Sequence, residues 1–181
     1  MTGRDLRKSP AVVIAVVGGK KSGKTTAVEA LIKALASRAY RVAAVKHISE
    51  PHFTIDTEGK DTWRYARSGA STVVAVSAGE IATIERRGED ELQLDGILER
   101  CRSSDVVVLE GFRRLVSKRK GVYKIVAVKS AQEALEAVRY FKPILAFTGR
   151  FSTAQLGLGR PYVDVLEEAE KLVDLVEAAM G

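Results

Sequence analysis

The 181-residue sequence predicts a three-layer α/β fold with a largely parallel central sheet and an added β-hairpin. Continuous apolar runs rich in β-branched residues, such as 11–17 (AVVIAVV) and 105–109 (DVVVL), are typical of strands buried on both faces of a parallel sheet. Segments with apolar residues at helical spacing separate these runs. Strands that alternate with helices favour a parallel sheet covered by helices on both faces.

The chain is expected to begin with a flexible basic tail, because residues 1–9 show no hydrophobic periodicity. Residues 10–181 contain no internal repeat and no long linker rich in Gly, Ser or Pro, so we expect them to form a single domain. The strand at 11–17 ends in glycines. The segment 25–37 then carries apolar residues such as Val28 at helical spacing, which predicts an amphipathic helix.

The same patterns predict the rest of the elements. In chain order they are a strand at 41–46, a helix at 59–70, a hairpin of strands at 71–77 and 81–86, a helix at 89–101, strands at 105–109 and 123–128, a helix at 131–140, a strand at 143–147 and a helix at 165–180.

The composition is that of a globular protein, with 46% hydrophobic and 29% charged residues. No stretch approaches the roughly 20 apolar residues of a membrane span and no signal-peptide pattern opens the chain, so we expect a cytoplasmic protein without a membrane partner. Cys101 is the single cysteine, which excludes an intramolecular disulfide and argues against a Cys/His zinc site. The absence of Asn and the presence of only three Gln suggest a thermophilic source.

A glycine-rich motif at 18–25 (GGKKSGKT) lies between a buried strand and an amphipathic helix, as a phosphate-binding P-loop requires. We therefore predict a P-loop NTPase fold, in which Lys24 reaches the β- and γ-phosphates and the Thr25 hydroxyl binds Mg²⁺. Lys20 and Lys21 either contact phosphate or only raise the local positive potential. The predicted nucleotide-binding residues of the loop are Gly18, Gly19, Lys20, Lys21, Ser22, Gly23, Lys24, Thr25 and Thr26.

Two carboxylates are candidates for catalysis and for the metal. Asp56 opens an Asp-x-x-Gly motif in which Gly59 would meet the γ-phosphate, although a plain solvated loop is an equal alternative. Glu110 directly follows the strand at 105–109, at the sheet edge where ligands of α/β proteins bind. It would bind Mg²⁺ or position water, or else form a local cap or salt bridge.

A basic loop and two histidines offer further contacts for an anion. The loop contains Arg113, Arg114, Lys118, Arg119, Lys120 and Lys124. With Tyr123 as its single aromatic residue and no nucleic-acid-binding module nearby, it favours an anionic small molecule or a partner protein, or a solvated surface, over nucleic acid. His47 and His52 flank Pro51, and either contact phosphate or substrate or are ordinary loop residues.

Together these residues resemble the MobB family, the nucleotide-binding adaptor of molybdopterin-guanine dinucleotide biosynthesis. The resemblance runs from about Val12 to Phe147. Besides the P-loop, it rests on Val45-Lys46-His47, His52, Asp56, Gly59-Lys60-Asp61-Thr62, Arg64, Gly69, Ala70, Leu109-Glu110-Gly111-Phe112 and Lys124-Ile125-Val126.

The resemblance implies that the protein binds GTP with Mg²⁺, hydrolyses it slowly at best and forms a homodimer. It also implies that the protein assists the guanylyltransferase MobA in attaching GMP to molybdopterin. Thr148-Gly149-Arg150 departs from the family, which often has a further polar residue there, so recognition of the base is unassigned. The candidate contacts with a substrate or partner anion are His47, His52, Lys60, Asp61, Arg64, Arg113 and Arg114.

Two other functions fit the same motifs. An ATP-dependent small-molecule kinase would use the P-loop for phosphoryl transfer, with residues 113–120 as a basic lid. A binding scaffold without nucleotide is the third possibility.

Overall fold

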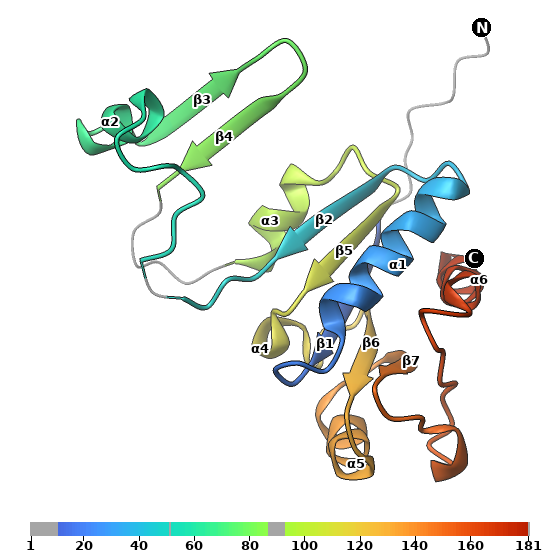
Figure 1. Ribbon diagram of the computed structural model, residues 1–181. Coiled ribbons are helices and arrows are strands. Elements are labelled where there is room, and N and C mark those ends of the chain that lie inside the picture. Colours follow the sequence, from blue (N-terminus) through green and yellow to red (C-terminus); the bar gives the residue numbers. More distant parts are fainter. Residues whose placement is uncertain (1–10, 51, 87–92, 181) are drawn as a thin grey trace, which may run out of the picture. The chain divides into compact units, whose positions relative to one another are not determined.

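The computed structural model describes residues 11–50, 52–86 and 93–180 (Figure 1). It divides into two compact units, which we call the sheet unit (Met1–His47 and Leu94–Gly181) and the hairpin unit (Ile48–Gln93). The predicted tail at 1–9 lies outside the described residues. Within the described ranges, no helix is long and apolar enough to cross a membrane.

The sheet unit contains five parallel strands in the order β2-β5-β1-β6-β7. Their bounds are β1 Val12–Gly18, β2 Val42–Lys46, β5 Val106–Glu110, β6 Val122–Val128 and β7 Ile144–Gly149. The central strand β1 is apolar along its whole length because neighbours cover both its faces, and Ile14 and Ala15 on its alternate faces are both fully buried.

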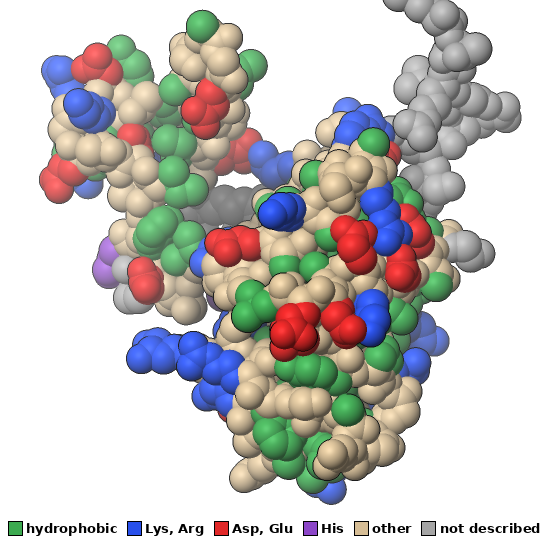
Figure 2. Space-filling model, turned by 45° about the vertical axis from the view of Figure 1, so that its right-hand side comes forward, with side chains coloured by type: hydrophobic (Ala, Val, Ile, Leu, Met, Phe, Trp, Pro, Cys, Tyr) green, Lys and Arg blue, Asp and Glu red, His purple; other side chains and the backbone are tan. Residues whose placement is uncertain are grey.

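Helices α1 (Lys24–Ser37) and α6 (Ala169–Met180) cover the sheet face that presents Ile14 and Val16. On the outer side of these helices, Arg38 pairs with Glu170, Asp174 and Glu177 at 2.7–2.9 Å and so ties the end of α1 to α6. Figure 2 shows basic and acidic side chains lying next to one another over this region.

The opposite sheet face is covered by shorter helices. They are α3 (Leu94–Arg100), α4 (Arg113–Val116) and α5 (Ala131–Tyr140), of which α4 contacts β1 and α5 contacts β6. Ser130 caps α5 by accepting a hydrogen bond from the Glu133 N–H at 3.3 Å.

The hairpin unit consists of α2 (Asp61–Arg67) and the antiparallel strands β3 (Thr72–Val76) and β4 (Ile81–Glu85). The Ser77 N–H donates to the Glu80 carbonyl at 2.9 Å and closes the turn. A mixed α/β fold with a mostly parallel central sheet and an added antiparallel hairpin was predicted, and it is confirmed.

Several predicted boundaries were wrong. The helix predicted at 59–70 is α2, shortened because Gly59 and Gly69 adopt positive φ angles of 84° and 109° on either side of it. The helix predicted from residue 165 begins at Ala169, after a turn in which Asp164 accepts from the Leu166 N–H. Helix α4 and a short 3₁₀ helix, Ala154–Leu156, were not predicted.

Candidate functional site

The P-loop connects the carboxyl end of β1 to the first turn of α1. At Gly18 the backbone has a φ of 153°, and a Cβ there would lie 2.2 Å from the Ala127 carbonyl oxygen of β6. Gly23, immediately before α1, has a φ of 95°. Glycine is therefore required at both positions, because the chain turns sharply and packs against β6.

Lys24 lies folded over its own loop. Its Nζ donates to the Gly19 carbonyl at 2.5 Å, and burial lowers the pKa of its ammonium group. Ser22 is fully buried, and its Oγ has no hydrogen-bond partner among the described residues. Lys20 and Lys21 are exposed. The loop thus carries one ammonium group folded back onto its own backbone, on Lys24, and one buried hydroxyl without a partner among the described residues, on Ser22.

Glu110 connects the P-loop helix to β2. The Thr25 hydroxyl donates to Glu110 Oε1 at 3.1 Å, and Lys46 Nζ lies 3.5 Å from the same oxygen. The register explains this cluster, since Glu110 pairs with Val16 on one side and Lys46 on the other. The Glu110 side chain is only 12% exposed, so its carboxylate faces the loop rather than bulk water.

The chain segments that follow β2 and β5 stay together beyond the sheet. The His47 N–H donates to the Glu110 carbonyl at 3.0 Å, and the His47 ring lies 5.2 Å from that of Phe112. Gly111 lets these segments approach, because a Cβ there would lie 3.3 Å from the Cβ of His47. The exposed His47 is thereby placed next to the strand end that carries Glu110.

Arg113 stands beside the P-loop but is held by aromatic rings. Its guanidinium carbon lies 4.8 Å from the ring centre of Tyr140 and 5.1 Å from that of Phe141. Arg113 also lines a cavity of about 170 Å³ together with Gly18 and Glu133. Its neighbour Arg114 is exposed.

Arg150 was not predicted as a site residue. It lines a second cavity, of about 230 Å³, with the loop residues from Lys21 to Thr26. Gly149 brings it there, because a Cβ at Gly149 would lie 2.8 Å from the Ser22 carbonyl oxygen. The signal in the sequence was the Thr-Gly-Arg triplet directly after the strand predicted at 143–147.

Lys124 and Arg119 correct the prediction of a continuous basic loop. Lys124 is fully buried inside β6, where its Nζ donates to the carbonyls of Arg119 and Lys142 at 2.8 and 2.6 Å. Arg119 forms an ion pair with Asp95. Neither side chain is therefore part of an open cationic surface.

The remaining candidates belong to the hairpin unit. Asp56 Oδ1 accepts from the Thr62 hydroxyl at 2.8 Å and from the Thr57 N–H at 2.9 Å, while its buried Oδ2 has no hydrogen-bond partner among the described residues. Asp61 and Arg64 face each other at 3.5 Å. Lys60 precedes α2, and His52 and Gly59 are exposed.

The described residues of the two units form no recognisable metal cage. Over the described ranges, no group of three or more His, Cys, Asp or Glu side chains is placed to hold a metal ion. A metal at Thr25 and Glu110 would thus need ligands from water or from a bound molecule.

The sequence and fold resemble those of known proteins. The family model of MobB, described as molybdopterin guanine dinucleotide synthesis protein B, matches residues 13–147. A probable molybdopterin-guanine dinucleotide biosynthesis adapter protein of Bacillus subtilis is 32% identical over 133 residues, which are 72% of each chain. The adapter protein of Haemophilus influenzae is 34% identical over 104 residues, 56% of this chain and 57% of that one.

Solved structures of similar fold match this protein over nearly its whole chain. A crystal structure of molybdopterin-guanine biosynthesis protein B superposes with a TM-score of 0.68 at 28% identity, covering 93% of this chain and 98% of the other. The structure of Bacillus subtilis MobB gives a TM-score of 0.69 at 25% identity, with 90% and 96% covered. Since the family model spans most of the residues that form the sheet, the P-loop and the hairpin, the chain belongs to the MobB family.

Proposed function

We propose that this MobB protein, an adapter in molybdopterin-guanine dinucleotide biosynthesis, binds GTP with Mg²⁺ through its P-loop and assists a MobA-type guanylyltransferase that attaches GMP to molybdopterin. The observation that carries the proposal is the arrangement of Lys24, Thr25 and Glu110 around one glycine loop. Loop N–H groups and the start of α1 favour a phosphate chain, and Lys24 adds a positive charge.

The residues present fit a magnesium nucleotide. Thr25 and Glu110 offer a hydroxyl and a carboxylate oxygen 3.1 Å apart, and Mg²⁺ prefers such oxygen ligands while keeping several waters. The unpaired Ser22 hydroxyl supplies a further polar group inside the loop. When bound, the metal would neutralise charge on the phosphates. We also keep Asp56 as a proposed carboxylate ligand of the Mg²⁺.

We expect at most slow hydrolysis. Glu110 Oε1 is engaged by Thr25 and Lys46, and the carboxylate is already proposed for the metal, so we do not assign Glu110 as the base that activates an attacking water. The stacking of Arg113 on Tyr140 and Phe141 argues against a mobile lid over the phosphates. Both features favour a nucleotide-binding adapter over a kinase.

The decisive experiment is a titration of labelled GTP and ATP into the parent protein and a Lys24→Ala variant. We expect GTP to bind the parent more tightly than ATP. We expect Lys24→Ala to abolish detectable binding without unfolding the protein, because a charge-assisted phosphate contact is lost from a solvent-accessible loop. Tighter ATP binding would favour the kinase, and no binding by the parent would favour the scaffold.

Lys33→Ala is the matched control. Lys33 is an exposed lysine of the same helix, and its replacement should leave GTP affinity unchanged. If a folded Lys24→Ala protein keeps the parent affinity, the P-loop assignment is wrong.

A further inference from the structure

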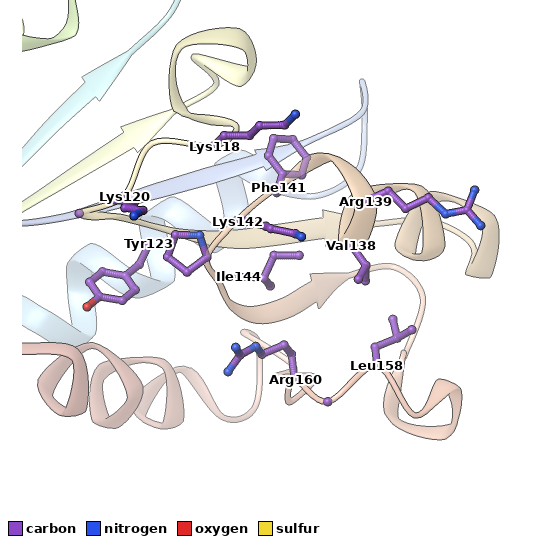
Figure 3. Close-up of a pocket in the computed structure, with 13 residues that line it drawn as sticks. Lys118, Lys120, Tyr123, Val138, Arg139, Phe141, Lys142, Ile144, Leu158 and Arg160 are labelled. Carbon is purple, nitrogen blue, oxygen red and sulfur yellow. The ribbon is translucent and has the colours of Figure 1, made fainter.

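A cavity of about 890 Å³ opens at the amino-terminal ends of β6 and β7 (Figure 3). Gly121 and Tyr123 line it at the start of β6, and Pro143 and Ile144 at the start of β7. In a parallel sheet these ends lie at the edge opposite the P-loop, which follows the carboxyl end of β1. The volume falls within the roughly 300–1,000 Å³ of small-molecule sites.

Among the described residues that line this cavity, the charged side chains are all cations, and none is Asp or Glu. The five basic side chains are Lys118, Lys120, Arg139, Lys142 and Arg160. For none of them is an ion pair found within the described ranges, unlike Arg38 or Arg119. Like charges gathered around one hollow without counter-charges raise its potential and favour an anion there.

Hydrogen bonds fix the backbone segments that carry three of these cations. The buried Lys124 ammonium donates to the carbonyls of Arg119 and Lys142, and the Lys142 N–H donates to the Ser117 carbonyl at 2.8 Å. The segments that carry Lys118, Lys120 and Lys142 are thereby fastened to one another. Because these backbone segments are fixed, a ligand that binds has only the exposed cationic side chains left to order.

Between the cations the walls are apolar. Phe141 and Ile144 are buried, and Val138, Pro143 and Leu158 complete the lining. Figure 3 shows Leu158 and Arg160 on the loop across β7 from Val138 and Arg139, at the end of α5. A ligand held there meets apolar or aromatic surface in the middle and positive charge at the rim.

We infer that this cavity is a second anion site, separate from the P-loop, which binds an organic phosphate carrying a flat heterocyclic ring. The basic rim holds the phosphate, and the surface formed by Tyr123, Pro143 and Leu158 takes the ring. The site is independent of the P-loop, so it stands whether or not the P-loop binds GTP.

The test measures binding of GMP, and separately of inorganic pyrophosphate, to the Lys24→Ala protein by calorimetry, so that the P-loop does not contribute. We expect saturable binding of GMP at one site, at least tenfold tighter than that of pyrophosphate, because only GMP has a ring for the apolar wall. In a Lys24→Ala background, Lys142→Gln with Arg160→Gln should weaken GMP binding at least tenfold.

The control replaces two exposed cations elsewhere, Lys33→Gln with Arg102→Gln, and so changes the net charge equally. It should leave GMP affinity unchanged. If both double variants lose the same GMP affinity, the effect comes from net charge alone and the proposal is overturned. An absence of saturable GMP binding would also overturn it, as would tighter binding of a decaglutamate peptide than of GMP, which would indicate an acidic protein partner instead.

Discussion

A single carboxylate oxygen, Oε1 of Glu110, joins residues from three elements of the sheet unit. It accepts from Thr25 of α1 and pairs with Lys46 of β2. Its hydrogen bond fixes the direction of the Thr25 hydroxyl, next to the end of β5. Its loss should affect the metal before the nucleotide, because Lys24 and the loop N–H groups still bind phosphate.

We therefore predict that Glu110→Ala raises the Mg²⁺ requirement for GTP binding and slows any hydrolysis by roughly tenfold or more, with a smaller change in nucleotide affinity. We predict the same for Asp56→Ala, whose buried Oδ2 is unpaired within the described residues. The measurement is the GTP affinity and the hydrolysis rate of each variant across a Mg²⁺ titration. Glu99→Ala, which removes an exposed carboxylate elsewhere, is the control. If both variants follow the parent curve, neither residue is the metal carboxylate and Asp61 is tested next.

Lys124 predicts a pH dependence of stability. Burial lowers the pKa of its ammonium group from 10.5 to about 8. Between these two pH values the unfolded chain binds more protons than the folded one, so this residue makes the free energy of unfolding rise with pH, by up to roughly 3 kcal/mol. Well below pH 8 both states are protonated and its contribution is constant.

A Lys124→Met variant should lack this rise. Urea unfolding of the parent and the variant at pH 7.5 and pH 10 measures the difference, since every other titrating group is common to both proteins. Equal pH dependence in the two proteins would contradict the lowered pKa of Lys124.

Among the elements, the β3–β4 hairpin has one covered and one open face. Val73 is buried on the side of the hairpin that packs against α2. On the other side Val74, Val76 and Ile81 are 55%, 72% and 70% exposed. A two-stranded hairpin is marginally stable by itself, and an exposed apolar face of this kind is suited to packing against another chain.

We predict a homodimer that uses this open face. Val76→Lys with Ile81→Lys should convert it to a monomer, because two ammonium groups would be buried in the interface. Light scattering at micromolar concentration, with and without GTP, gives the mass. Leu135→Lys with Leu166→Lys, at exposed apolar positions of the sheet unit, is the control and should stay dimeric. A parent protein of monomer mass in both conditions would reject the dimer.

For the molecule as a whole, composition and surface charge predict thermal stability. The chain has no Asn and three Gln, and Arg38 joins three carboxylates of α6 in one network. Networks of this kind stabilise most at high temperature. We predict a Tm above about 65 °C by calorimetry. A Tm within the mesophilic range would contradict a thermophilic source.

Local patterns in the sequence determined the strands of the parallel sheet, the P-loop and the amphipathic helices. The run at 11–17, the glycines after it and the helix from 25 are consecutive in the chain, so each constrains the next. The four-residue helix α4 escaped prediction because it is too short to show a periodicity.

Only the tertiary structure decided which distant residues meet. Thr25 and Glu110 are 85 positions apart and touch because parallel register brings the ends of β1 and β5 together. Lys124 looks like its basic neighbours in the sequence but is buried, since it lies within β6, an interior strand covered on both faces. The cavity at the opposite edge combines segments around 120, 140 and 160, and no local pattern encodes that proximity, because it arises from strand order and packing.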